Sequence, residues 1–184
     1  MLHSQFFILN SSFSILPSIF MTLTDLQADI YQALGERAIP VIYREKILTE
    51  RTRQFVLFPP DTPHVTPEKV HIHYTLLGIE LKLGTRRLSC PDLGTARFLQ
   101  VFGRLGVGIV AVPYDISQIP RIADDLESGW QHLLLLIEDR AGDRPLRTRL
   151  TIRNRLMEQM RQDIEKLGPG TKVPQFNQNT RQRR

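Results

Sequence analysis

Hydrophobic residues recur every three to four positions in several parts of the chain, with polar residues between them. This spacing is typical of helices that bury one face. It predicts helices over residues 24–35, 92–105, 117–140 and 147–167. Thr24 can cap the first helix, and Asp92 or Thr95 the second, because their side chains accept hydrogen bonds from free amides of a first turn. Gly168-Pro169-Gly170 ends the last helix.

A second pattern, in which hydrophobic and polar residues alternate, runs through residues 70–83 and predicts strands with one buried face. Gly78 breaks the phase, so the segment is either one bulged strand or two strands. Gly84-Thr85 then fits a hairpin turn into one more strand. Uncharged apolar runs predict further strands at 55–58 and 107–112.

The order of these elements is a helix, three or four strands, a helix, a strand and two helices, which predicts an α/β or α+β fold. We expect one domain over residues 21–140, with a mixed central sheet flanked by helices. A basic helix over residues 141–170 and a disordered basic tail over residues 171–184 should follow it.

Residues 1–20 are apolar and contain no Lys, Arg, Asp or Glu. Polar residues and Pro17 interrupt this run, so it is too short and too broken to span a bilayer. We expect an unstructured extension or a start assigned too early. A segment that touches a membrane or directs export is the alternative.

Composition narrows the class of protein. The chain has 184 residues, of which 41% are hydrophobic and 23% charged, and this excludes a wholly disordered or coiled-coil chain. Cys90 is the sole cysteine, so an internal disulfide framework and a multi-cysteine metal site are excluded. A reducing compartment, the cytoplasm, is therefore expected.

The formal net charge of +5 is unevenly distributed. Residues 1–140 hold 13 Lys and Arg against 15 Asp and Glu, whereas residues 141–184 hold 11 against 4. The first part is therefore slightly acidic, at −2, and the last part is strongly basic, at +7. The basic part is dominated by Arg147, Arg149, Arg153, Arg155, Arg161, Arg181, Arg183 and Arg184.

Clustered arginines neutralise phosphates and carboxylates, so residues 141–184 predict contact with an anionic macromolecule. An acidic protein, a nucleic acid or the surface of an anionic membrane would fit as the partner. A solvated helix face with a solubilising tail would explain the same residues without any partner.

The sharpest chemical motif is a Pro-Asp pair that ends at Asp61, separated by eighteen residues from Glu-Leu-Lys at 80–82. It resembles the motif of the PD-(D/E)XK nuclease superfamily, whose core runs helix, three strands, helix, strand. This resemblance implies that Asp61 and Glu80 bind Mg²⁺. It also implies that Lys82 assists the attacking water and that Gln100 lies near the site. The alternative is that Glu80 and Lys82 form the solvated face of an amphipathic strand.

Two further features could carry chemistry. His71 and His73 share one strand face, where Glu80 or His64 could complete a metal site; surface histidines are the alternative. Cys90 directly precedes a predicted helix, whose dipole could lower the pKa of the thiol. A packed, unreactive cysteine is the alternative.

Two hypotheses for the function follow from these features. The favoured one is a non-enzymatic binding or assembly module whose basic region contacts an anionic partner. The other is a Mg²⁺-dependent nuclease that cleaves the phosphodiester bonds of nucleic acids, with Asp61, Glu80 and Lys82 at its centre.

Overall fold

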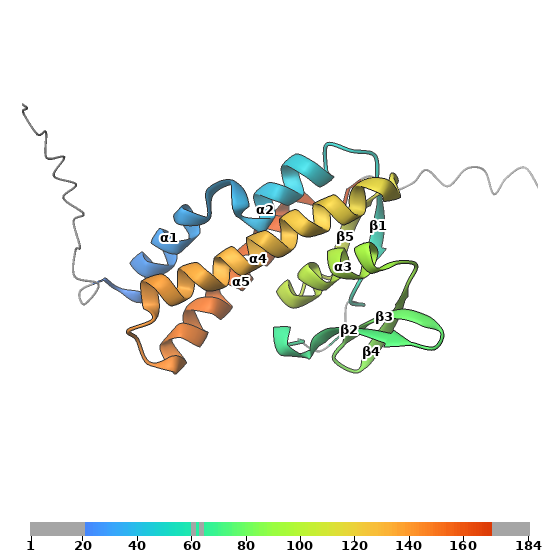
Figure 1. Ribbon diagram of the computed structural model, residues 1–184. Helices are drawn as coiled ribbons and strands as arrows, with labels where there is room; N and C mark the ends of the chain where they lie inside the picture. Colours follow the sequence, from blue (N-terminus) through green and yellow to red (C-terminus); the bar gives the residue numbers. More distant parts are fainter. Residues whose placement is uncertain (1–20, 60–61, 63–64, 171–184) are drawn as a thin grey trace, which may run out of the picture.

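The computed structural model describes residues 21–59, 62 and 65–170, which form a mixed α+β fold (Figure 1). Its α-helices are α1 (Leu23–Leu34), α2 (Ile39–Ile42), α3 (Leu93–Leu105), α4 (Ile119–Ala141) and α5 (Leu146–Leu167). Its strands are β1 (Thr52–Val56), β2 (Val70–Thr75), β3 (Gly78–Leu83), β4 (Arg86–Cys90) and β5 (Ile109–Pro113). Short helical turns are η2 (Gly35–Arg37), η3 (Tyr43–Ile47), η4 (Pro67–Lys69) and η5 (Ile116–Gln118).

The predicted helices are present, with one change at the first N-terminus. The N-cap of α1 is Thr22, not Thr24: its side chain accepts a hydrogen bond from the Asp25 amide, and the Asp25 carboxylate accepts one from the Thr22 amide. Two free amides are satisfied by this reciprocal pair, which fixes the start of the helix. In α3 the Asp92 carboxylate accepts a hydrogen bond from the Thr95 amide at 2.7 Å, as predicted for a cap.

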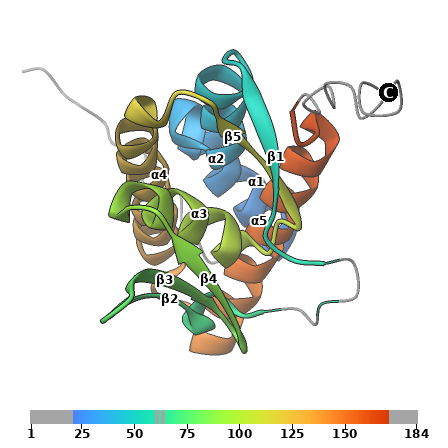
Figure 2. The same ribbon diagram turned by 90° about the vertical axis from the view of Figure 1, so that its right-hand side faces the viewer.

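The strands form two separate antiparallel sheets rather than one sheet, and Figure 2 shows β1 and β5 apart from β2, β3 and β4. In the first, β1 pairs with β5, and in the second the strand order is β2-β3-β4. The expectation of one mixed central sheet is therefore wrong for the described residues. Residues 70–83 form two strands joined by a turn, and β5 pairs with β1 instead of joining them.

Helix α3 lies between α4 and the three-stranded sheet, as Figure 1 shows. Its contact with the sheet is close at Gly103, where a Cβ atom would lie 2.7 Å from the Leu83 side chain. Val70, Leu81 and Leu83 are buried beneath the helix. This packing leaves the other face of the three-stranded sheet turned outward.

Helix α5 is part of the same packed body as the helices that precede it. It contacts α1, α2, α3 and α4, and it lies beside α1 and α4 in Figure 1. Five of its side chains are buried in the shared core: Ile152, Leu156, Met157, Met160 and Ile164. The core thus extends beyond residue 140. No helix in the described part of the chain is long and apolar enough to cross a membrane.

The hydroxyl of Tyr43 holds the end of α5 against the two-stranded sheet. Tyr43 is fully buried, accepts a hydrogen bond from the Ala111 amide at 3.0 Å and donates one to the Gly168 carbonyl at 2.8 Å. Ala111 lies on β5, whose free edge would otherwise bury an unpaired amide here. Burial raises the pKa of Tyr43, so the phenol stays protonated and can donate.

Candidate functional site

Basic side chains from three strands meet on the outward face of the three-stranded sheet. His71 of β2 lies opposite Lys82 of β3, and Lys82 lies opposite Arg87 of β4. Directly opposed residues in antiparallel strands project to the same face, with Cβ atoms about 5 Å apart. His71, Lys82 and Arg87 therefore form one row across the sheet, which we call the basic row.

A shallow hollow borders the basic row at the end of the sheet where β3 turns into β4. It is lined by Lys69, Gly84 and Thr85 together with His71 and Lys82. The Gly84 amide donates a hydrogen bond to the Lys69 carbonyl at 3.0 Å, which holds Lys69 beside the turn. Neither Lys69 nor Lys82 forms an ion pair with another described residue.

One carboxylate lies on the same face. Glu80 stands in the next row of the sheet, between His73 of β2 and Ser89 of β4. Its Oε2 atom is buried and lies 3.6 Å from the guanidinium of Arg87. Glu80 therefore offsets part of the charge of Arg87, while Lys82 remains without a counter-charge among the described residues.

The structure brings two of the predicted nuclease residues together and separates a third. Glu80 and Lys82 project from β3 to the outward face, as the alternation predicted. Gln100 lies on α3, which covers the opposite, buried face, and its amide donates a hydrogen bond to the Val70 carbonyl at 3.2 Å. Asp61 lies outside the described residues. The nuclease assignment of these residues stays a prediction.

The histidine pair was the other candidate for a metal site. The rings of His71 and His73 are 6.4 Å apart, at an interplanar angle of 80°. Among residues 21–59, 62 and 65–170, no group of three or more His, Cys, Asp and Glu side chains is placed to hold a metal ion. His64, considered as a further ligand, is outside those residues.

Cys90 is a packed residue at the end of β4. Its thiol is buried, and this burial raises the pKa above that of a free cysteine. A hydrogen bond from the backbone of Leu81 lowers the pKa and the charge of Asp92 raises it. The pKa shift therefore opposes the helix-dipole activation considered from sequence, and the alternative of a packed cysteine describes Cys90 better.

The arginines of α5 divide into paired and unpaired side chains. Three of them bind carboxylates within the molecule at 2.6 Å: Arg149 with Glu138, Arg153 with Glu68, and Arg161 with Glu158. Arg147 and Arg155 are exposed and form no ion pair with another described residue. The predicted arginines at 181, 183 and 184 lie outside the described residues.

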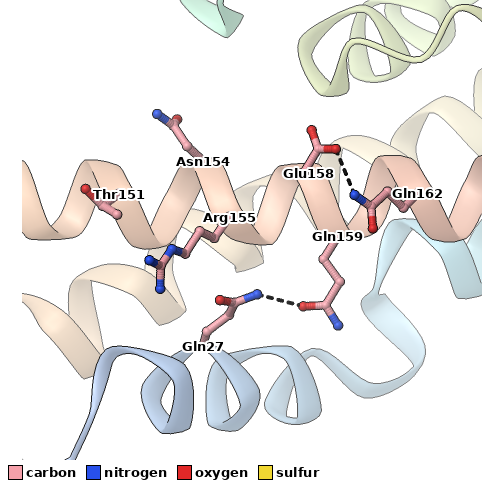
Figure 3. Close-up of a pocket in the computed structure, with 7 residues that line it drawn as sticks. All are labelled: Gln27, Thr151, Asn154, Arg155, Glu158, Gln159 and Gln162. Carbon is pink, nitrogen blue, oxygen red and sulfur yellow. Dashed lines mark hydrogen bonds between the residues drawn. The ribbon is translucent and has the colours of Figure 1, made fainter.

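Arg155 lies at an open polar groove between α5 and α1 (Figure 3). Gln27 of α1 donates a hydrogen bond to Gln159 of α5 at 2.9 Å across the floor of this groove. On the α5 side, Gln162 donates one to Glu158 at 2.9 Å. Amide groups thus dominate the groove, and the guanidinium of Arg155 is its cation.

The Arg153–Glu68 ion pair links α5 to the sheet. Glu68 belongs to η4, immediately before Lys69, so the pair fixes the start of β2 against the helix. A hydrogen bond from its own amide and the guanidinium of Arg153 hold the pKa of Glu68 below its usual value. Asn154 borders both the hollow that contains Glu68 and the groove that contains Arg155.

Sequence reasoning missed the exposed apolar residues at the turn between β2 and β3. They are Leu76 and Leu77 in the turn and Tyr74 near the end of β2, and together we call them the hairpin tip. In that order, these side chains are 107%, 95% and 71% exposed. In Figure 1 the turn points away from the helices. Two leucines at a turn where polar residues or glycine are usual would have been the sequence signal.

No protein-family model, curated protein or solved structure matches the chain.

Proposed function

We propose that the protein is a non-enzymatic binding module that contacts an anionic macromolecule or surface through the outward face of its three-stranded sheet. Lys69 and the basic row supply the main contacts. Arg147 and Arg155 of α5 are proposed as further contacts, and so are the arginines at 181, 183 and 184 that the charge pattern suggests. Three α5 arginines that the charge pattern suggested for the same role have intramolecular partners instead.

The observation that carries the proposal is the direct opposition of Lys82 and Arg87 on neighbouring strands. Like charges at opposed positions destabilise an antiparallel pair. His71 extends the row on the other side of Lys82. An anion placed over the row would relieve the repulsion between Lys82 and Arg87, and the attraction would weaken as salt screens the charges.

Binding to heparin, a polyanion without a defined sequence, tests the proposal. The full chain should bind heparin at low salt and lose affinity as salt rises. The double variant Lys82→Gln, Arg87→Gln should bind at least about tenfold more weakly at about 50 mM salt, because two cationic contacts are removed. It should also show a shallower dependence of log affinity on log salt.

A matched control removes the same charge from a different surface. Arg44 and Arg121 are exposed residues near η3 and at the start of α4, away from the basic row. The variant Arg44→Gln, Arg121→Gln should keep most of the affinity for heparin. Equal losses in the two double variants would show that net charge alone governs binding, and the proposed face would be abandoned.

The nuclease hypothesis is kept as a second candidate because Glu80 and Lys82 share one outward face. It requires Mg²⁺-dependent cleavage of DNA or RNA, which a binding module does not need. Glu80→Ala should abolish such cleavage if Glu80 is a metal ligand. Absence of cleavage by the wild-type chain across supercoiled DNA, linear DNA and single-stranded RNA would reject the hypothesis.

A further inference from the structure

The hairpin tip is the most exposed apolar feature among the described residues. Leu76 and Leu77 occupy the two positions between β2 and β3, and they are 107% and 95% exposed. Tyr74, near the end of β2, is 71% exposed. Neighbouring apolar side chains that are all exposed mark a surface that binds a membrane or another molecule.

The shape of the tip favours one kind of occupant. The turn points away from the helices (Figure 1), so its consecutive leucines form a projecting apolar tip that a protein partner could cover only with a pocket built to receive it. A lipid bilayer accepts a projecting apolar tip without such a pocket. Tyr74 sits just behind the leucines, and tyrosine suits the boundary between acyl chains and headgroups because one end is apolar and the other polar.

Some backbone groups of the turn form hydrogen bonds within the hairpin. These bonds lower the free-energy cost of moving the turn from water into an apolar phase. The Thr75 hydroxyl accepts a hydrogen bond from the Leu77 amide at 3.3 Å and donates one to the Gly78 carbonyl at 3.0 Å. Gly78 has φ of 126°, a conformation that favours glycine and closes the turn without a side chain. Backbone groups without a partner are strongly disfavoured in an apolar phase.

The charges of the same hairpin complement an anionic membrane. Lys82 lies four residues behind Gly78, roughly 13 Å along the strand. Arg87 and His71 flank it in the basic row. Glu80, which stands between the tip and that row, has its carboxylate beside Arg87. Cations behind an apolar tip match lipid phosphates above acyl chains.

We infer that the hairpin tip inserts into the surface of an anionic lipid bilayer, with the basic row bound to the headgroups. This inference rests on the proposed function, because the cationic face supplies the attraction to the bilayer. It adds the identity of the partner and assigns an anchoring role to Leu76 and Leu77. The body of the protein would remain on the water side.

Co-sedimentation of the full chain with lipid vesicles tests the inference. The chain should bind vesicles of phosphatidylcholine with phosphatidylserine and bind vesicles of phosphatidylcholine alone much more weakly. Leu76→Ser with Leu77→Ser should lower the partition coefficient about tenfold or more, because two apolar side chains no longer leave water. Its affinity for heparin should be unchanged, which shows that the variant is folded and that the basic row is intact.

A matched control replaces two exposed leucines elsewhere. Leu135 and Leu146 are 67% and 63% exposed on α4 and α5. Leu135→Ser with Leu146→Ser should bind vesicles like the wild type. Equal losses in the control and the tip variant would overturn the inference, since they would show that general surface hydrophobicity drives binding.

A spectroscopic variant reports where the tip lies. Leu76→Trp should show a blue shift of its emission on binding, and lipids brominated in the acyl chains should quench it. The native Trp130 is buried and should contribute little to this change. An unshifted, unquenched emission in the bound state would overturn insertion.

The remaining outcomes separate this inference from the proposed function. If the wild type binds heparin but no vesicles, the inference fails and the proposed function stands. If the tip instead joins two copies of the chain, the wild type will be dimeric by analytical ultracentrifugation and the Leu76→Ser, Leu77→Ser variant monomeric, which also overturns the inference. If the wild type binds neither heparin nor anionic vesicles, the proposed function fails, and the inference with it.

Discussion

The hydroxyl of Tyr43 joins segments that lie far apart in the sequence. It accepts a hydrogen bond from the amide of Ala111 and donates one to the carbonyl of Gly168, 125 residues away. Tyr43→Phe would leave the buried Ala111 amide and the half-buried Gly168 carbonyl without this partner. We expect the free energy of unfolding, measured by urea denaturation at neutral pH, to fall by about 1–3 kcal/mol.

The matched control for this variant is Tyr114→Phe. The ring of Tyr114 is partly exposed and lies beside the Arg51 guanidinium, so its hydroxyl should matter by less than about 0.5 kcal/mol. A similar loss in both variants would show that the hydrogen bonds of Tyr43 are not the cause.

The same substitution should change the pH dependence of stability. Burial raises the pKa of Tyr43, so the folded state binds the phenol proton more tightly than the unfolded state does. This contribution is complete below the pKa of an unfolded tyrosine, about 10, and is lost as pH rises through the folded pKa. Tyr43→Phe should therefore flatten the decline of stability above pH of about 10.

Individual side chains were predictable from sequence where strand geometry alone decides their direction. Glu80 and Lys82 share a face because successive strand residues alternate between faces. The partner of Gln100 was not predictable, because the Val70 carbonyl lies 30 residues away and meets it only after α3 packs on the sheet. A glutamine at this position is equally compatible with a role in catalysis and with a structural hydrogen bond, so the residue type alone does not decide between them.

At the scale of elements, Gly129 sets how closely α4 approaches η2. A Cβ atom at Gly129 would lie 2.5 Å from the carbonyl oxygen of Arg37. Alanine favours a helix interior over glycine by about 1 kcal/mol, but a backbone oxygen cannot move aside as a flexible side chain can. We expect Gly129→Ala to destabilise the protein by about 1–2 kcal/mol, since overpacking outweighs the gain in helix propensity.

The exposed neighbour Ser128 provides the control for that variant. Ser128→Ala should leave the melting temperature unchanged or raise it slightly, because serine is the weaker helix former. A Gly129→Ala protein that melts at or above the wild-type temperature would contradict the close approach of α4 to η2.

Arginines of α5 have two different roles, an ion pair within the molecule and a proposed contact with an anionic partner. Variants of Arg153 and Arg155 should distinguish these roles in experiment. Arg153→Gln removes the ion pair with Glu68 and should lower the free energy of unfolding by up to about 1 kcal/mol, with little effect on heparin binding. Arg155→Gln should weaken heparin binding without a change in stability, because Arg155 is exposed and has no ion pair with another described residue. Equal effects of both variants in the two measurements would contradict this division.

Helices were predicted well because caps and periodicity are local signals. Asp92 and the Gly168-Pro169-Gly170 segment mark ends that a reader of the sequence can find. Sheet topology was not predicted, because β1 and β5 are separated in sequence by the three-stranded sheet and α3, and no local pattern specifies that they pair. The same limit applies to α5, since Glu68 and Glu138 are distant in sequence from the arginines that they neutralise.

For the whole molecule, the excess of basic residues after residue 140 does not mark a separate basic appendage. Much of that charge belongs to a helix that is buried on one side and paired with carboxylates on its flanks. The uncompensated cations that the structure describes lie partly on the three-stranded sheet, within residues 1–140, the part of the chain whose net charge is slightly negative. Net charge by segment was therefore a poor guide to the location of the cationic surface.

Two truncations test whether α5 belongs to the folded body. A chain that ends at Arg140 loses five buried side chains and the hydrogen bond between Tyr43 and Gly168. Each large buried side chain is worth about 2–5 kcal/mol, whereas a whole domain is stable by only about 5–15 kcal/mol. We expect this chain to show no cooperative thermal transition by circular dichroism. A chain that ends at Gly170 keeps those contacts and should melt like the wild type. If the chain that ends at Arg140 melts cooperatively, α5 is an appendage after all.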